Sequence, residues 1–121
     1  MKYAWTTIVV QDFDSSVQFY TEIVGLKVQR QFTTDDGSSF IFLGENEGTL
    51  IELIYRPDGQ PLTSGDAISL GFAVESLDEM IAFVQERGIT LLTDVIQPSK
   101  EIKFFYVLDP NGVKIQFSES M

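Results

Sequence analysis

The sequence predicts an α+β fold in which two tandem β-α-β-β-β modules form a curved, cleft-enclosing mixed sheet. The first observation behind this is an internal repeat, because residues 65–121 align with residues 1–57 at a constant offset of 64 positions. A unit present only twice indicates paired supersecondary modules and not an open solenoid. The second is that apolar residues recur with helical spacing once per repeat and alternate elsewhere, as in half-buried strands. Identical residues share the offset at seven pairs: Val10/Val74, Asp14/Asp78, Phe19/Phe83, Glu22/Glu86, Phe40/Phe104, Gly48/Gly112 and Ile51/Ile115.

Module one, residues 1–56, opens with a predicted strand over about 3–10, in which successive side chains alternate between the two faces of the sheet. A helix is expected over about 13–24, because Asp12 can cap its start and Gly25 suits its end. Its buried stripe is predicted to consist of Phe13, Val17, Tyr20 and Val24. Strands follow at about 26–34, 38–44 and 49–56.

Module two, residues 67–121, repeats this order with a strand at about 67–74 and a helix that ends at Gly88. Ser76 and Glu79 have the spacing of a capping box at the start of that helix. Strands are expected at about 90–95, 102–108 and 113–119. Residues 57–66 between the modules are rich in Pro, Gly and polar residues, which is typical of a linker. We therefore expect one domain over residues 1–121. The apolar stripe of the helix of module two is predicted to consist of Leu77, Met80, Ile81 and Val84.

Alternation assigns the two faces of each sheet. The side of the 49–55 strand without a charge, which carries Ile51 and Leu53, is expected to meet the helix of module one. By the same reasoning Ile115 and Phe117 lie under the second helix. The opposite, open face mixes polar, apolar and small residues, which is typical of a ligand cleft. It is predicted to carry Trp5, Thr7, Val9, Leu50, Glu52, Ile54, Ser69, Gly71, Ala73, Lys114, Gln116 and Ser118.

Composition excludes several classes of function. The net charge of −10 and the lack of a basic cluster argue against nucleic acid and anionic membranes as partners. The chain has no Cys, so disulfides and thiolate chemistry are excluded. It has no His, which removes His-dependent acid–base catalysis and iron sites with two His ligands. With neither a spanning apolar run nor a signal-peptide pattern, we expect a cytoplasmic protein.

Three segments resemble the vicinal oxygen chelate superfamily, which includes glyoxalase I, bleomycin-resistance proteins and extradiol dioxygenases. Residues 10–26, VQDFDSSVQFYTEIVGL, resemble the strand–helix opening of that family. Residues 51–53, IEL, resemble its mid-chain strand, and residues 109–117, DPNGVKIQF, resemble its closing hairpin. The resemblance runs the full length of the chain and rests on these segments together with the repeat. The resemblance implies the paired-module fold.

The resemblance also implies where a metal would bind in the metal-dependent members of the superfamily. Their ligands come from the first and last strand of each module, and these positions fall on Trp5, Glu52, Ser69 and Gln116. Glu52 is the one good ligand for a divalent metal in this set, since Trp5 has no lone pair to donate. We therefore expect no metal and no other cofactor.

Two functions remain open. One is a metal-independent protein of the glyoxalase/bleomycin-resistance type that binds, and can sequester, an aromatic or cationic small molecule. The alternative is a lyase or isomerase of the same superfamily that uses Glu52 as general base. Glu52 could instead be an ion-paired carboxylate, for example with Lys114. A homodimer is expected, because each module leaves a sheet edge and relatives commonly pair modules. The predicted ligand-binding residues are Trp5, Thr7, Glu52, Ser69, Gly71, Lys114 and Gln116, with Glu52 also the candidate catalytic residue.

Overall fold

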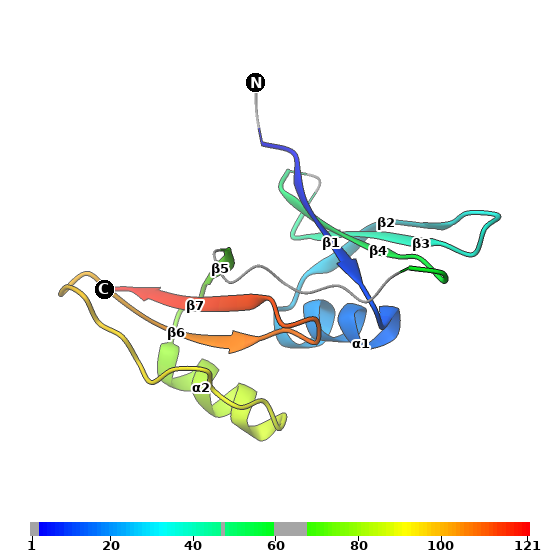
Figure 1. The fold of residues 1–121 in the computed structure, drawn as a ribbon. Coiled ribbons are helices and arrows are strands. Elements are labelled where there is room, and N and C mark those ends of the chain that lie inside the picture. Colours follow the sequence, from blue (N-terminus) through cyan, green and yellow to red (C-terminus); the bar gives the residue numbers. More distant parts are fainter. Residues whose placement is uncertain (1–2, 47, 60–67) are drawn as a thin grey trace. The chain divides into compact units, whose positions relative to one another are not determined.

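The computed structural model describes residues 3–46, 48–59 and 68–121. The chain divides into two compact units, Met1–Thr63 and Ser64–Met121, and each is described by itself. The boundary between them falls within residues 60–67, so the predicted linker lies largely outside the described residues. Both units combine strands with helices, which confirms the α+β class (Figure 1).

The first unit is a four-stranded sheet with one helical segment, as the sequence predicts. Its elements are β1 (Trp5–Val10), α1 (Phe13–Gln18), η1 (Phe19–Ile23), β2 (Lys27–Thr33), β3 (Ser39–Gly44) and β4 (Leu50–Tyr55). The strand order is β1-β4-β3-β2, with β1 parallel to β4 and the other pairs antiparallel. The helical segment packs along one face of this sheet (Figure 1). The sheet core on that face consists of Val10, Ile41, Leu43, Ile51 and Leu53.

The helical segment departs from the predicted stripe. Its last turn is a π-helix, in which the Val24 amide donates to the Phe19 carbonyl at 3.1 Å. The wider turn changes which side chains point inward. Ser16, Phe19 and Tyr20 are buried, whereas Phe13, Val17 and Val24 are half-buried, so of the predicted stripe of Phe13, Val17, Tyr20 and Val24 only Tyr20 is fully buried. The ends are as predicted, since Asp12 accepts from the Ser15 amide and Gly25 has φ +87°.

The second unit has one strand fewer than predicted. It contains β5 (Ser69–Ala73), α2 (Leu77–Glu86), β6 (Ile102–Leu108) and β7 (Lys114–Ser120), in the sheet order β5-β7-β6. Helix α2 packs on the face that carries Ile115 and Phe117, which confirms that assignment (Figure 1). The core consists of Leu77, Val84, Phe105, Val107, Ile115 and Phe117.

The missing strand is the one expected over 90–95. That segment bonds to β6 at separated points: the Leu92 amide donates to the Tyr106 carbonyl, and Ile96 forms an isolated bridge with Phe104. Between them the Tyr106 amide donates to the Thr93 hydroxyl at 3.2 Å. A side-chain oxygen thus replaces the backbone acceptor that a regular ladder needs, and the strand is interrupted there.

Residues related by the 64-residue repeat form equivalent cross-strand pairs in the two units. Trp5 pairs with Leu50 as Ser69 pairs with Lys114, and Thr7 pairs with Glu52 as Gly71 pairs with Gln116. The irregularity also repeats, because β2 has a register shift between Val28 and Arg30, the positions equivalent to Leu92 and Asp94. Equivalent side chains of the two units therefore lie at equivalent places on their own sheets.

A tight turn joins β2 to β3 in the first unit. Asp36 there accepts from the Thr34 hydroxyl and, at 3.0 Å, from the Ser38 amide. These bonds lower the pKa of the Asp36 carboxyl below its ordinary value, and the bond from the Thr34 hydroxyl contributes most. Gly37 has φ +87° in this turn, a conformation that favours glycine.

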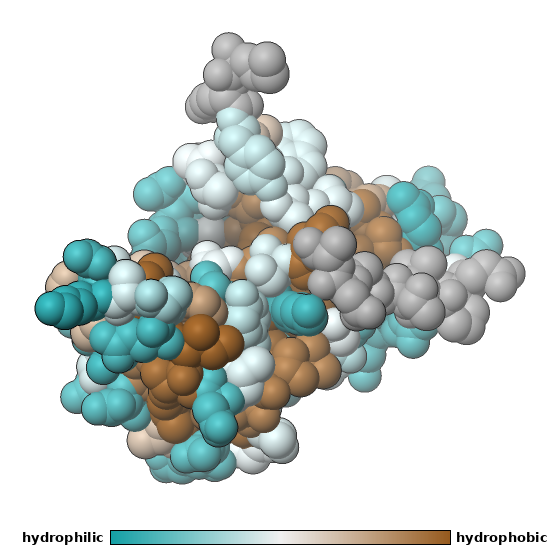
Figure 2. All heavy atoms as spheres, turned by 60° about the vertical axis from the view of Figure 1, so that its left-hand side comes forward, coloured by the Kyte–Doolittle hydropathy of each residue, from teal (hydrophilic) through white to brown (hydrophobic). Residues whose placement is uncertain are grey.

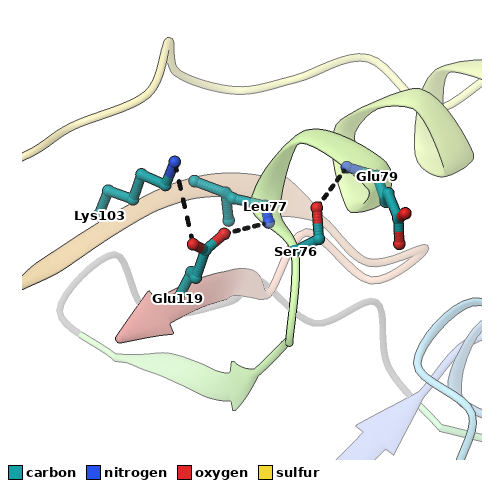
Figure 3. Close-up of polar contacts among 5 residues, drawn as sticks. All are labelled: Ser76, Leu77, Glu79, Lys103 and Glu119. Carbon is teal, nitrogen blue, oxygen red and sulfur yellow. Dashed lines mark hydrogen bonds and ion pairs between the residues drawn. The ribbon is translucent and has the colours of Figure 1, made fainter. Parts of the chain in front are cut away.

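A carboxylate from the last strand secures the start of α2 (Figure 3). Glu119 accepts from the Leu77 amide at 2.6 Å and lies 4.0 Å from the Lys103 ammonium. The Ser76 hydroxyl accepts from the Glu79 amide at 3.2 Å, which is the predicted cap (Figure 3). Two otherwise unpaired amides of the first helical turn are thus satisfied.

Replacing Glu119 with Gln should lower the free energy of unfolding by about 0.5–1 kcal/mol, because a negative charge at a helix N-terminus is lost. Urea denaturation of the whole chain measures this. The matched control is Glu86→Gln at the opposite end of α2, where removing a negative charge should be neutral or slightly stabilising. Equal effects of both variants would contradict the role of Glu119.

Candidate functional site

The face of the first sheet that points away from its helix carries a row of four side chains, one from each strand. Cross-strand pairing joins Thr7 on β1 to Glu52 on β4, Glu52 to Phe42 on β3, and Phe42 to Arg30 on β2. Residues directly opposite one another in this way share a face and lie within contact distance. We call these four residues, with Trp5 beside them, the open-face row.

Glu52 is held in place at the centre of this row. The Thr7 hydroxyl donates to Glu52 Oε1 at 2.7 Å. This bond fixes the carboxylate on the open face. Glu52 is half-buried, so it reaches both the sheet and the solvent.

Aromatic rings border the carboxylate. The Trp5 ring meets Phe42 edge to face, with centroids 5.4 Å apart and planes at 81°. Trp5 remains 47% exposed, whereas Phe42 is 4% exposed. The Trp5 ring is therefore partly exposed and is supported by the buried ring of Phe42. An exposed, supported ring of this kind is suited to stacking.

Leu50 and Ile54 lie on the open face as predicted, but both are buried. Both belong to β4, which has a neighbouring strand on each side, so flanking side chains cover them more than they cover the edge strand β1. Trp5, Thr7 and Val9 on β1 are exposed as expected.

The second unit brings its predicted site residues onto one face of its own sheet. Ser69 pairs with Lys114 and Gly71 with Gln116. The Gln116 amide nitrogen donates to the Tyr106 hydroxyl at 3.0 Å. A Cβ at Gly71 would lie 3.3 Å from Gln116 Oε1, so the glycine leaves room for this amide. This face is neutral at the position where the first unit has Glu52.

Sequence reasoning missed Arg30. Its guanidinium carbon lies 4.2 Å from the centroid of the Phe42 ring. Alternation in the 26–34 strand places Arg30 on the same side as Phe32, but joining that side to Phe42 requires the register of the β2–β3 hairpin. That register includes a shift before Arg30, which the sequence does not reveal.

Large apolar side chains also reach the surface of the molecule. Figure 2 shows them between hydrophilic ones on the face that it presents. In the first unit Trp5, Val9 and Phe32 are exposed, and Phe32 stacks on Phe40 with ring centroids 4.8 Å apart. The open face of this unit is therefore apolar around a central charged row.

The family model of the Glyoxalase/Bleomycin resistance protein/Dioxygenase superfamily matches residues 2–117. The chain belongs to this superfamily. A lactoylglutathione lyase of Salmonella typhimurium is 28% identical, covering 99% of this chain and 93% of that protein. The uncharacterised YwkD of Bacillus subtilis is also 28% identical, covering 93% and 91%.

Solved structures of the superfamily agree in fold. The trypanothione-dependent glyoxalase I of Leishmania major matches with a TM-score of 0.81 and 28% identity over 97% of this chain and 85% of that one. A glyoxalase family protein of Bacillus cereus has the same TM-score at 20% identity, covering 100% and 95%. The similarity to the Bacillus cereus protein concerns the fold alone.

The side chains at the superfamily's metal positions do not fit a divalent metal. Trp5 has no lone pair, and Glu52 Oε1 already accepts from Thr7. Ser69 and Gln116 are neutral, and the Gln116 amide nitrogen is bonded to Tyr106. Among the described residues, no three His, Cys, Asp or Glu side chains gather in a group that could hold a metal ion. In the same residues, no helix is long and apolar enough to cross a membrane.

Phe42→Leu should cost about 1–2 kcal/mol of stability, since it removes buried ring atoms and the edge contact with Trp5. It should also shift the fluorescence of Trp5, which is the sole Trp in the chain. Chemical denaturation followed by intrinsic fluorescence measures both. Phe32→Leu is the matched control: Phe32 is 47% exposed, so it should cost less and leave the emission unchanged. A larger cost for Phe32→Leu would contradict this account of the face.

Proposed function

We propose that this protein binds an uncharged-to-cationic aromatic small molecule without a metal, in the manner of the bleomycin-resistance branch of its superfamily. The observation that carries this proposal is the oriented Glu52 carboxylate on the same sheet face as the exposed Trp5 ring, with Phe42 as the common neighbour of both. A carboxylate whose position is fixed by a hydroxyl donor can pair with a ligand cation at low ordering cost.

The expected interaction free energies are large enough for reversible binding. Stacking of a cation on Trp is worth about 0.5–2 kcal/mol, depending on how far it is desolvated. A charge-assisted bond to Glu52 adds about 1.5–3 kcal/mol. With burial of a planar group against the apolar surroundings, affinity reaches roughly the micromolar range. The net charge of −10 further favours a cationic over an anionic ligand.

The second candidate is a lyase or isomerase in which Glu52 acts as general base. The relatives that favour it are the lactoylglutathione lyase and the glyoxalase I, each 28% identical to this chain. Glu52 is the one carboxylate among the four positions implied for a metal, so a proton transfer without metal would fall to it. Turnover of an α-hydroxythioester or hemithioacetal that Glu52→Gln abolishes would favour this candidate over binding alone.

The remaining site residues are proposed by equivalence. Ser69, Gly71, Lys114 and Gln116 occupy in the second unit the places that Trp5, Thr7, Leu50 and Glu52 occupy in the first. They would supply neutral hydrogen-bonding groups, a cation and free space on the open face of the second unit. We further propose that the protein is a homodimer, because each module leaves a sheet edge and the resemblance implies paired modules, and that it is cytoplasmic.

Metal independence has a direct test. Purified protein should contain far less than one metal ion per chain by elemental analysis, because three of the four expected ligands are not chelating residues. Treatment with a chelator should leave the melting temperature unchanged. Stoichiometric Zn²⁺, Ni²⁺ or Fe²⁺ whose removal destabilises the protein would refute the proposal.

Ligand binding is tested by quenching of Trp5 fluorescence with a library of cationic aromatic compounds that includes bleomycin-type glycopeptides. Glu52→Gln should weaken the cationic hits about tenfold or more, because the counter-charge is lost, and should leave neutral analogues unaffected. Glu22→Gln removes an exposed acid of the same unit and should change neither. If anionic compounds bind, or if Glu52→Gln leaves the affinity for the cationic compounds unchanged, Glu52 has another role.

Sedimentation equilibrium tests the assembly. A dimer mass should persist at tens of micromolar protein, roughly the range in which an interface of standard size holds. A monomer at that concentration would count against the homodimer without bearing on ligand binding by the first unit.

A further inference from the structure

The two units differ at one equivalent place on their open faces. In the first unit the Thr7 hydroxyl donates to Glu52 Oε1 at 2.7 Å. The equivalent cross-strand pair of the second unit is Gly71 and Gln116, so the amide oxygen there lies opposite a residue without a side chain. Gln116 Oε1 therefore lacks the hydroxyl donor that its counterpart in the first unit has.

The space beside this amide oxygen is open. Apart from the chain neighbours of Gly71, Gln116 Oε1, at 3.3 Å, is the one heavy atom among the described residues within 4 Å of the position that a Gly71 Cβ would take. Gly71 is exposed, and it belongs to β5, an edge strand of its sheet. A small group of a ligand can thus reach Oε1 from the side of β5.

The Tyr106 side chain orients the Gln116 amide. Gln116 Nε2 donates to the Tyr106 hydroxyl at 3.0 Å, while Oε1 lies beside Gly71. Tyr106 is itself anchored, because its amide donates to the Thr93 hydroxyl at 3.2 Å and its carbonyl accepts from the Leu92 amide at 2.7 Å. In the described part of the chain every buried side-chain nitrogen or oxygen has a partner, and no group donates to Oε1, so this oxygen reaches solvent. An acceptor that is oriented in advance binds a donor at low ordering cost.

The chemistry of this place selects a neutral group that is both donor and acceptor. The Gln116 oxygen accepts a bond from N–H or O–H and has nothing to offer a carboxylate. The Tyr106 oxygen already accepts from Gln116, so its own hydrogen remains for an acceptor. A primary amide carries both an N–H and a carbonyl. The Phe104 and Tyr106 rings, which meet edge to face 5.8 Å apart on this face, supply aromatic contact for the rest of the ligand.

We infer that the open face of the second unit binds the primary amide of a neutral aromatic molecule. The N–H of the ligand occupies beside Gly71 the place that the Thr7 hydroxyl occupies in the first unit. This inference rests on the part of the proposed function that assigns ligand contacts to the second unit, and it requires neither Trp5 nor Glu52.

Benzamide is the probe, and methyl benzoate, which has the carbonyl but no N–H, is its comparison. Titration of the isotope-labelled full chain, followed by NMR at the Gln116 side-chain amide, measures both affinities. The signal of this amide is assigned by its loss in Gln116→Glu. Benzamide should bind with a Kd in roughly the millimolar range, as expected of so small a ligand. The ester should bind about tenfold more weakly, because it brings no donor to Oε1.

Two variants should remove this preference for benzamide. Gly71→Thr reproduces the pair of the first unit, so its own hydroxyl donates to Oε1 and fills the space, and Thr is favourable in a strand. Tyr106→Phe releases the Gln116 amide from its fixed orientation and should leave the affinity for the ester unchanged. Ala73→Thr is the matched control: it adds the same side chain to the same face of β5, but opposite Ser118, and should change neither affinity.

Each other outcome overturns a defined statement. Absence of benzamide binding, or equal affinity of the unmodified protein for benzamide and the ester, would refute the inference and leave the cation site at Glu52 standing. A preference for benzamide that survives Gly71→Thr would also refute it, as would an equal loss in Gly71→Thr and Ala73→Thr. Selective binding of benzamide by a protein that binds no cationic aromatic compound would refute the role of Glu52 alone.

Discussion

The parallel pairing of the first strand of each unit with its last strand is the constraint on which the rest of the molecule depends. In a parallel pair the register cannot be set by a short turn, because the connecting chain includes the helix and two more strands. Register is therefore fixed by burial: a slip of one residue would turn Ile51 and Leu53, or Ile115 and Phe117, away from the helix. Once these residues are seated, Thr7 must face Glu52 and Gly71 must face Gln116.

The same constraint explains how two similar sheets acquire different chemistry. Equivalent positions keep equivalent places, so single substitutions alter polarity without altering architecture. The first unit has Thr, Glu, Phe and Arg across its row, and the second has Gly, Gln and Tyr at the first three of those places. A hydroxyl–carboxylate pair in one unit thus corresponds to an amide–phenol pair in the other. At these first three places Glu52 of the first unit is the only charged residue.

Most of the fold follows from the sequence because its signals are local. The repeat, the alternation and the capping residues Asp12 and Ser76 placed the helices and all strands but one. The failures arise where backbone hydrogen bonding departs from the regular pattern. Periodicity assumes a constant number of residues per turn, so it could not anticipate the π-helical turn that buries Phe19 in place of Val24. Alternation likewise reported strand character over 90–95 without showing that the Thr93 hydroxyl replaces a backbone acceptor. Alternation correctly placed Trp5, Thr7 and Glu52 on the open face, while placing Arg30 there required a hairpin register.

The interrupted segment beside β6 affects how the second unit meets other proteins. Strand β6 is an edge of its sheet, and a regular edge exposes a row of donors and acceptors that can template pairing with another chain. Here the backbone groups of Phe104 and Tyr106 that face outward are occupied by Ile96, Thr93 and Leu92. The occupying segment is too irregular to act as a new edge itself. The middle of this edge is thereby closed without the sheet being extended, which disfavours pairing of β6 with a strand of another chain.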